Sequence, residues 1–309
     1  MSLNPLSLFR AMPGSIAQGM IWGVMALGVY ITFRLLDFAD LTVDGSIATG
    51  AAVSVMLIRA GVSPIATLPI AFLAGALAGM VTGLLNTALG IPGILASILT
   101  QISLYSINLN IMGKANQPVS VDNYPLVVSL RYVTDGSVSR LLFFLGMIVF
   151  LLALIAVMYW YFGTEQGHAI RATGCNGNMA RAQGINTNFI KVLALMISNG
   201  LVALSSALLA QYQGFADVNM GRGAIVIGLA AVIIGEAIFG RIFHNFALRL
   251  LSVAFGSILY YLVLQTVIWL GIDTDLLKML SALVVAVFLA VPYWKTKYFT
   301  KPTKRGGNN

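Results

Sequence analysis

Long apolar stretches alternate along the chain with short polar segments. Most of these stretches have close to the roughly 20 residues that an α-helix needs to cross a hydrocarbon core. Eight of them are nearly free of charge, at residues 14–33, 64–89, 93–112, 141–162, 187–210, 224–239, 250–270 and 276–292. A shorter candidate covers 45–58. The pattern therefore predicts an all-α, polytopic membrane protein with about nine transmembrane helices.

The composition supports a membrane protein. Of the 309 residues, 59% are hydrophobic and 9% are charged, whereas a soluble domain carries roughly 25% charged residues. The opening segment MSLNPLSLFRAMPG has no apolar run that ends at a small-residue cleavage site, so we expect it to lead into the first span and not to be a removable signal peptide. The single Cys175 excludes an internal disulfide. We expect no metal site and no catalytic residue.

The positive charges gather beside the predicted spans. Five of the 18 basic residues lie in the tail 293–309, and three more, Arg171, Arg181 and Lys191, surround the polar stretch 163–191. Since cytoplasmic loops concentrate Lys and Arg, both regions are predicted to be cytoplasmic, which places the N-terminus outside. Several basic residues fall outside in this orientation: Arg59, Lys114, Arg131, Arg140 and Lys278. The charges thus indicate orientation, not nucleic-acid binding.

Two pairs of segments match each other at similar spacing. FADLTVDGS at 38–46 matches FADVNMGRG at 215–223, and GIPGILASILT at 90–100 matches GIDTDLLKMLS at 271–281; the paired segments begin 177 and 181 residues apart. We predict two repeats, about 14–112 and 187–292, around a central span at 141–162, within one transmembrane domain covering 1–309. An offset of five spans inverts the second copy, as in many transporters.

The matched, interrupted segments Asp37–Ser46 and Gln211–Gly223 are rich in polar residues. Carboxylates beside apolar spans are costly unless they face water, a partner or a cavity. They either line a solute path or act as loop residues and helix caps, as Asp44 would at the start of the second span. The candidates for a path or gate are Asp40, Thr42, Asp44, Ser46, Asp217, Asn219 and Arg222.

The span at 93–112 carries a polar face. Gln101, Tyr105 and Asn108 recur at i, i+4 and i+7, so they share one side of a helix. Such side chains either hydrogen-bond to neighbouring helices, which we favour, or face the solute. Gln101 and Asn108 therefore join the path candidates. Gly75, Gly79 and Gly83 recur every four residues and predict close packing against another helix.

The polar stretch 163–191 is the longest between spans. Its punctuation predicts a short surface helix over 176–183, capped by Asn176 and ended by Gly184. Such a helix offers small side chains and arginine either to a protein partner or to lipid headgroups. The sequence holds no GxxxxGK[ST] loop for nucleotide phosphates. If ATP drives the protein, another chain must bind it.

Three blocks of this chain resemble a known family. Arg171-Ala172-x-Gly174-x-Asn176, then Ala180 and Gly184-Ile185-Asn186, is similar to the cytoplasmic coupling loop of ATP-binding-cassette (ABC) importer permeases of the branched-chain amino acid and ribose type. The segment LDFADLTVDGSIATGAAV at 36–53 resembles the family's approach to the second span. The blocks ADLTVDGS and GIPGILASILT are similar to permeases labelled as putative tryptophan/tyrosine transporters. The resemblance covers about 15–290.

The resemblance implies a permease, not an enzyme, in the cytoplasmic membrane. Its implied partners are a second permease copy, two cytoplasmic ATPase subunits that bind ATP and Mg, and an external solute-binding protein, and the implied solute is a small molecule such as an aromatic or hydrophobic amino acid. The loop 163–186 would couple to the ATPase through Arg171, Ala172, Gly174, Asn176, Ala180, Arg181, Gly184 and Ile185. Some family members carry an acidic residue in this loop, where this chain has Cys175 and Asn176. The resemblance therefore does not specify which residues of the loop pair with the ATPase.

A secondary transporter driven by an ion gradient is the alternative, because such proteins also use inverted repeats. It needs a carboxylate deep in a span, and Glu236, the only acid within a predicted span, lies near the cytoplasmic end. A passive channel would leave the long loop unexplained.

Overall fold

The structure is a computed structural model that describes residues 5–120, 122–134, 137–240, 242 and 245–270, with isolated positions between 276 and 290. The first half of the chain forms α1 (Pro5–Tyr30), the π-helix η1 (Ile31–Leu35), α2 (Thr42–Arg59), α3 (Pro64–Thr87), α4 (Gly93–Met112), β1 (Asn116–Pro118) and α5 (Leu130–Thr134). The second half forms α6 (Ser137–Phe162), α7 (Glu165–Cys175), α8 (Gly177–Ala182), α9 (Thr187–Gln213), β2 (Phe215–Asp217), α10 (Ala224–Phe239) and α11 (Phe246–Trp269).

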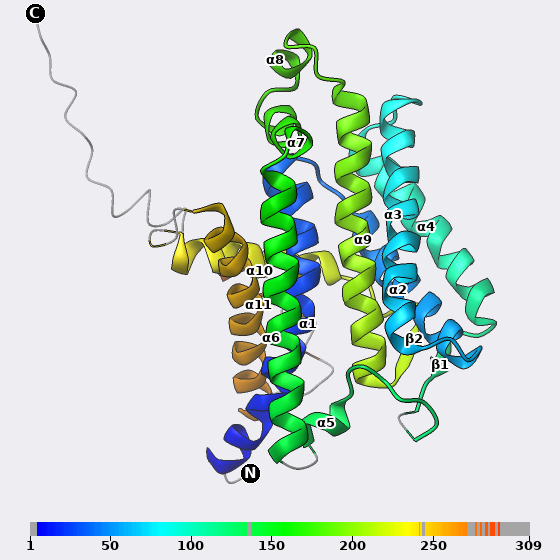
Figure 1. Cartoon of the computed structure of the whole chain (residues 1–309), viewed down its shortest axis with the longest axis vertical. Coiled ribbons are helices and arrows are strands. Elements are labelled where there is room, and N and C mark those ends of the chain that lie inside the picture. Colours follow the sequence, from blue (N-terminus) through cyan, green and yellow to red (C-terminus); the bar gives the residue numbers. More distant parts are fainter. Residues whose placement is uncertain are drawn as a thin grey trace, which may run out of the picture.

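The helices form a bundle whose centre is made by α1 and α9 (Figure 1). Helices α2 and α3 pack along one side of α9, with α4 against α2, while α10 and α11 pack against α1. Within the described residues, six helices are long and apolar enough to cross a membrane: α1 with η1, α3, α4, α6, α9 and α11. The structure is therefore that of an all-α, polytopic membrane protein.

Eight of the nine predicted spans are present as helices, and the ninth, 276–292, lies largely outside the described residues. Two of the eight are short: α2 has 18 residues and α10 has 16. The predicted interruption Asp37–Ser46 is too long, because α2 already begins at Thr42. The predicted interruption Gln211–Gly223 likewise begins too early, since α9 continues to Gln213. The sequence did not predict α7, β1 or β2.

The glycine stripe on α3 packs as predicted. A side chain on Gly75 would overlap the backbone carbonyl of Asn199, and one on Gly79 would overlap that of Leu195, both on α9. Without side chains these positions let the backbones of α3 and α9 touch. This contact holds α3 against the centre of the bundle.

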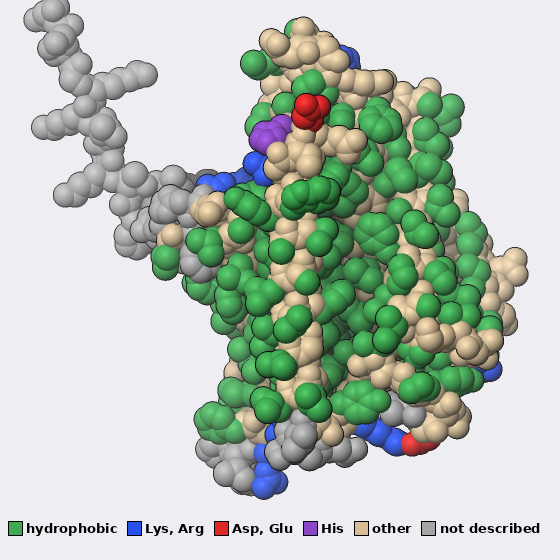
Figure 2. All heavy atoms as spheres, in the orientation of Figure 1, with side chains coloured by type: hydrophobic (Ala, Val, Ile, Leu, Met, Phe, Trp, Pro, Cys, Tyr) green, Lys and Arg blue, Asp and Glu red, His purple; other side chains and the backbone are tan. Residues whose placement is uncertain are grey.

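Different elements lie at the two ends of the bundle. Figure 1 shows α7 and α8 at one end and the N-terminus, α5, β1 and β2 at the other. Strands β1 and β2 pair antiparallel, with Asn116 opposite Asp217, and tie the end of α4 to the end of α9. In Figure 2 the charged side chains lie at the two ends, with hydrophobic side chains between them. This distribution is typical of a membrane protein whose middle section is surrounded by lipid.

Candidate functional site

The first interrupted segment leads from η1 into α2 and buries an aspartate. Asp40 is 2% exposed, and its Oδ1 accepts a hydrogen bond from the Thr42 backbone N–H at 2.9 Å. Its Oδ2 accepts one from Asn199 Nδ2, on α9, at 2.7 Å. Since both carboxylate oxygens have donors, the segment is fixed at the start of α2 by a turn of its own and by a bond to α9.

Other polar residues of this segment extend the same buried network. Ser46 donates to Asn199 Oδ1 at 2.6 Å. Thr42 and Thr82 share a hydrogen bond of 2.7 Å, and Thr82 donates to Thr100 at 2.9 Å. The network joins α2, α3, α4 and α9. The path candidates Asp40, Thr42 and Ser46 therefore hold helices together, and none of them lines either of the two cavities described below.

The second interrupted segment forms a similar turn in a more open place. The Asn219 backbone N–H donates to Asp217 Oδ1 at 2.7 Å, and Asn116 Nδ2 lies 3.4 Å from the other oxygen. Asn219 is exposed and Asp217 is half-buried at the end of β2. Asp217 therefore belongs to β2, and Asn219 lies in the turn that follows this strand.

The two segments meet at Asp44. Its carboxylate accepts hydrogen bonds from the backbone N–H groups of Gly223 at 2.9 Å and Ile225 at 3.0 Å, at the first turn of α10. A side chain on Gly221 would overlap the Asp44 carbonyl, so the backbones touch there. Asp44 was expected to cap its own helix or line a path. In the structure it caps α10, where its negative charge also faces the positive end of the helix dipole.

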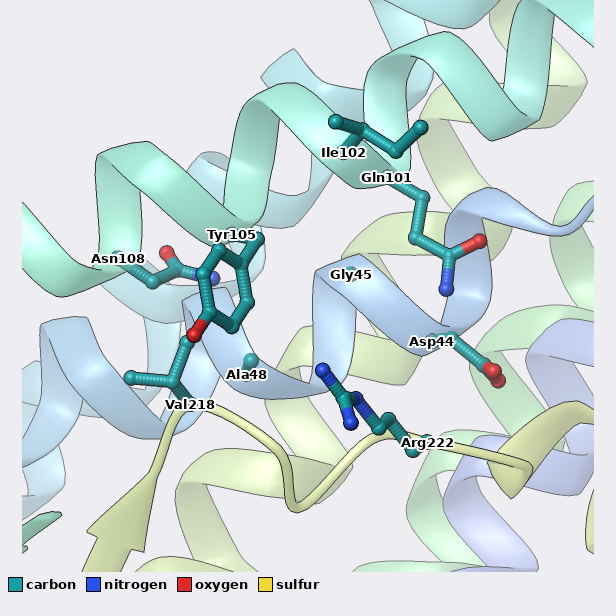
Figure 3. A pocket seen from close by; sticks show the side chains of 9 residues that line it. All are labelled: Asp44, Gly45, Ala48, Gln101, Ile102, Tyr105, Asn108, Val218 and Arg222. Atoms are coloured by element: carbon teal, nitrogen blue, oxygen red, sulfur yellow. The ribbon is translucent and has the colours of Figure 1, made fainter. Parts of the chain in front are cut away.

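A cavity of about 260 Å³ lies beside this contact (Figure 3). It brings together four path candidates, Asp44, Gln101, Asn108 and Arg222. The sequence did not single out the other lining residues, although Tyr105 shares the predicted polar face of α4 with Gln101 and Asn108. These others are Gly45, Ala48, Ile102, Tyr105 and Val218. The solute-facing interpretation of this face, the less favoured of the two, thus agrees better with the placement of Gln101 and Asn108.

Two polar side chains of this cavity stand out. Arg222 is exposed, and its guanidinium forms no hydrogen bond or ion pair with the described residues. Asn108 is fully buried, and among the described residues neither its Nδ2 nor its Oδ1 has a partner. A second hollow, of about 420 Å³, lies beside α1 and α9, and no charged side chain lines it. The smaller cavity is therefore the better candidate for a polar solute.

The predicted surface helix is confirmed as α8. Asn176 Oδ1 accepts from the backbone N–H groups of Asn178 and Met179, each at 3.1 Å, and Gly184 follows the helix at a φ of +84°. The preceding helix α7 was missed because its sequence, EQGHAIRATGC, has two glycines and little apolar periodicity. Thr164 caps it by accepting from the Gly167 backbone N–H.

Helix α7 packs against the membrane helices through its backbone. A side chain on Gly174 would overlap the carbonyl of Leu35, in η1. The Arg171 guanidinium lies 4.0 Å from the ring centroid of Phe246, at the start of α11, and partial burial lowers the pKa of Arg171 below its ordinary value. Through these contacts α7 touches the ends of two helices that lie far apart in the sequence.

The coupling candidates divide into two faces. Arg171, Gly174 and Ala180 face the protein itself, and Ala180 is 3% exposed. Arg181 is exposed, although its Nε donates to Thr187 at 2.8 Å. The remaining candidates are exposed or half-buried: Ala172, Asn176, Gly184 and Ile185. A partner would thus contact mainly α8 and the outer side of α7.

An ion pair joins the two halves of the bundle near α7. Arg34 Nε, on η1, lies 3.0 Å from Glu236 Oε1, near the end of α10. Both side chains are partly exposed. The only acid within a predicted span is therefore paired at the end of its helix. Among the described residues, no group of three His, Cys, Asp or Glu side chains is placed to hold a metal ion.

Comparisons with known proteins agree along most of the chain. Residues 12–291 match the family model described as "Branched-chain amino acid transport system / permease component". A tyrosine transport system permease protein of Clostridioides difficile is 38% identical over 275 residues, which cover 89% of both chains. The uncharacterized protein RP368 of Rickettsia prowazekii is 35% identical, over 89% of this chain and 95% of its own. The autoinducer 2 import system permease protein LsrC of Yersinia pseudotuberculosis is 31% identical, over 69% of this chain and 58% of its own.

Proposed function

The chain belongs to the family of permease components of branched-chain amino acid transport systems, and we propose that it is the membrane-spanning subunit of an ABC importer for an aromatic or hydrophobic amino acid. The family that the coupling-loop and second-span segments resemble is thereby confirmed. The observation that carries the choice of solute is the 38% identity to a tyrosine transport permease over 89% of both chains. The cavity supports it, because Arg222, Asp44 and two amides offer partners to both charges of a zwitterion.

We further propose that the chain holds nine spans in two inverted repeats, with the N-terminus outside. Two features support the repeats: Asp40 and Asp217 make the same turn 177 residues apart, and α2 and α10 are both short helices that start beside Asp44. Discontinuous helices at matching positions are typical of solute sites in inverted-repeat transporters. The α7–α8 end would be cytoplasmic and would meet the ATPase, which binds ATP and Mg. The β1–β2 end would meet the solute-binding protein.

A second permease copy would cover the outer face of α4. This face exposes Ser103, Ser106 and Asn110 among apolar residues, and polar side chains are rarely left facing lipid. The outer face of α6, by contrast, exposes apolar residues from Leu141 to Val157 and ends in Tyr159 and Trp160, as a lipid-facing helix does. The mixed surface of α4 therefore suits contact with a second permease copy.

The contacts of α7 suggest how ATPase closure reaches the solute path. Force on α8 and the outer side of α7 would pass to η1 through Gly174 and Leu35, and to α11 through Arg171 and Phe246. From η1 the chain continues through Asp40 into α2, and the Arg34–Glu236 pair joins η1 to α10. Both short helices beside the cavity are thus connected to one end of the bundle.

Gly174→Val tests this coupling. The added side chain would overlap the Leu35 carbonyl and displace α7, and displacing such a fitted contact costs about 1–3 kcal/mol, or about 5- to 150-fold in an equilibrium. We expect an assembled permease with strongly reduced ATP-dependent uptake. Gly146→Val, in α6, is the matched control, because a side chain there meets no atom within 4 Å. Full uptake by Gly174→Val would remove α7 from the coupling path. Ala180 is unsuited to this test, since it packs inside its own chain.

Cysteine labelling tests the orientation. Cys175 is exposed, so Cys175→Ser provides the background. Asn178→Cys, in α8, should react only with a cytoplasmic reagent, and Asn123→Cys, near β1, only with an external one. The reverse pattern would discard the proposed orientation while leaving the family assignment intact.

The alternative, an ion-gradient-driven transporter, has one structural feature in its favour. Asp40 is a buried carboxylate in the middle of the bundle, the kind of group that carries protons in such proteins. Its two oxygens are occupied by Thr42 and Asn199, which suits a structural role better. Uptake that responds to ATP and not to an ion gradient separates the two functions.

A further inference from the structure

We infer that the cavity between α2, α4 and residues 218–222 selects an aromatic amino acid that carries a hydroxyl group, with Arg222 binding its carboxylate and Asn108 binding the hydroxyl. This inference rests on the proposed function and adds a binding site and a basis for selectivity. Figure 3 shows both side chains at the cavity, with the Tyr105 ring and Ala48 between them in this view.

Asn108 supplies the first argument. A buried side-chain amide normally satisfies its donors and its acceptor within the protein, because a buried unpaired polar group costs free energy. Asn108 is fully buried and lines the cavity, yet neither its Nδ2 nor its Oδ1 has a partner among the described residues. A solute hydroxyl can donate to the oxygen and accept from the nitrogen, and therefore suits this amide.

Arg222 supplies the second argument. Asp44 is the acid of the same cavity, but its carboxylate is held by the backbone of Gly223 and Ile225. The positive charge of Arg222 therefore has no ion-pair partner among the described side chains. Its planar guanidinium is the group that best matches a planar carboxylate. The ammonium group of the solute would lie at the same end, where Asp44 and Gln101 offer free lone pairs of their oxygens.

The distance between the two ends of the cavity suits the length of an aromatic amino acid. A side chain on Gly45 would lie 3.2 Å from Gln101 Cα, so Gln101 lies beside Asp44, at the N-terminal end of α2. Asn108 follows seven residues later on the same helix, a rise of about 10 Å. Between them the walls are made by Ala48, Tyr105 and Val218. An aromatic amino acid with a hydroxyl on its ring spans such a site, whereas alanine or serine does not.

The arrangement explains why tyrosine would be preferred to phenylalanine. A site that hydrogen-bonds a substrate hydroxyl rejects the analogue lacking it, since the buried amide then stays unpaired. Van der Waals contact with Tyr105 and Val218 favours both amino acids equally, so it contributes affinity without selectivity. Selectivity within the permease would therefore depend on Asn108.

The test measures uptake of radiolabelled L-tyrosine and L-phenylalanine by proteoliposomes that hold the permease with its ATPase and its solute-binding protein. Asn108→Leu keeps the size of the side chain and removes both polar atoms. We expect it to lower the efficiency of tyrosine uptake by about 5- to 150-fold, with phenylalanine uptake equal to or above that of the unaltered permease. Val149→Leu, on the lipid-facing side of α6, also introduces a leucine and should change neither. All variants share one binding protein, so a changed ratio comes from the permease.

A second measurement probes the other end of the cavity and does not depend on a core substitution. Arg222→Gln should weaken binding of tyrosine to the detergent-purified permease by tenfold or more and leave binding of tyramine, which lacks the carboxylate, unchanged. An Asn108→Leu complex that takes up tyrosine and phenylalanine in the unaltered ratio would overturn the site, as would an equal effect of Arg222→Gln on tyrosine and tyramine. If the unaltered complex takes up neither amino acid with ATP, the proposed function itself fails.

Discussion

Segments 38–46 and 215–223 begin with the same three residues and fold the same turn, yet the turns lie in different surroundings. Asp40 accepts the Thr42 N–H at 2.9 Å and Asp217 accepts the Asn219 N–H at 2.7 Å. Asp40 is 2% exposed and also bonds to Asn199 of α9, whereas Asp217 lies half-buried at the end of β2. The repeated sequence thus specifies the local turn, and the neighbouring helices decide what the aspartate does.

The contact between the segments shows the same asymmetry. Asp44 of the first segment caps α10, while its matched residue in the second segment, 177 positions later, is Gly221, which has no side chain to offer in return. Glycine is required there because the two backbones touch. The equivalent positions therefore act as the two sides of one contact.

The largest effect is expected for Gly221→Ala. Its Cβ would overlap the Asp44 carbonyl, and because a backbone atom stands in the way the helices must separate. The cost should reach or exceed the upper end of the usual ~1–3 kcal/mol for overpacking. We expect a lower Tm of the purified permease and uptake below a tenth of normal. Gly146→Ala, in α6, is the control, because nothing lies within 4 Å of its Cβ. Equal behaviour of the two variants would show that the segments are not in contact.

Asp40→Ala is expected to have the next largest effect on stability and uptake. It leaves the Thr42 N–H and one N–H of Asn199 without acceptors in a buried place, at a cost of roughly 1–3 kcal/mol. Thermal unfolding should therefore begin at a lower temperature, and uptake should fall with the amount of folded complex. Restored stability in Asp40→Asn, with uptake still lost, would instead assign Asp40 a role in transport.

Asp44→Ala removes the cap of α10. Loss of an N-cap side chain typically costs about 0.5–2 kcal/mol, so a moderate fall in Tm is expected. Asp44→Asn keeps one acceptor oxygen and should recover most of the stability. Hydrogen exchange of the Gly223 and Ile225 amides reports the cap directly. Unchanged exchange in Asp44→Ala would mean that these amides have another partner.

Asp217→Ala should have the smallest effect. The aspartate is half-exposed, its bond to Asn116 is long at 3.4 Å, and surface changes usually stay within about 0.5 kcal/mol. Tm and uptake should both be near normal. From the internal repeat alone, Asp40 and Asp217 are equally good candidates for the solute path. If Asp217→Ala lowered Tm and uptake as much as Asp40→Ala, the two aspartates would not have different roles.

The sequence predicted the helices because long apolar runs at membrane length leave few alternatives. It also predicted α8, since Asn176 and Gly184 mark its ends, and the α3–α9 contact, since three glycines share one face. It missed α7, which is held by contacts to Leu35 and Phe246 from distant parts of the chain. The β1–β2 pair was missed for the same reason, because each strand has three residues and depends on the other.

The candidate site was predicted only in part. Polar type and spacing identified Gln101, Asn108 and Arg222, but the sequence does not say which polar residues bond to each other. Asn199 forms hydrogen bonds with Asp40 and Ser46, which lie 159 and 153 residues away in the sequence. Asn108 does not find such a partner among the described residues. This difference separates structural from solute-facing residues and requires the folded chain.

ATP hydrolysis by a partner subunit is proposed to drive amino acid uptake through this permease. The most direct measurement is uptake of labelled tyrosine into proteoliposomes, with the solute-binding protein on the outside and the ATPase and ATP enclosed. We expect uptake against a concentration gradient that requires ATP, stops when the ATPase is omitted and does not respond to an imposed proton or sodium gradient. Uptake by the permease alone, driven by an ion gradient, would instead identify the protein as a secondary transporter.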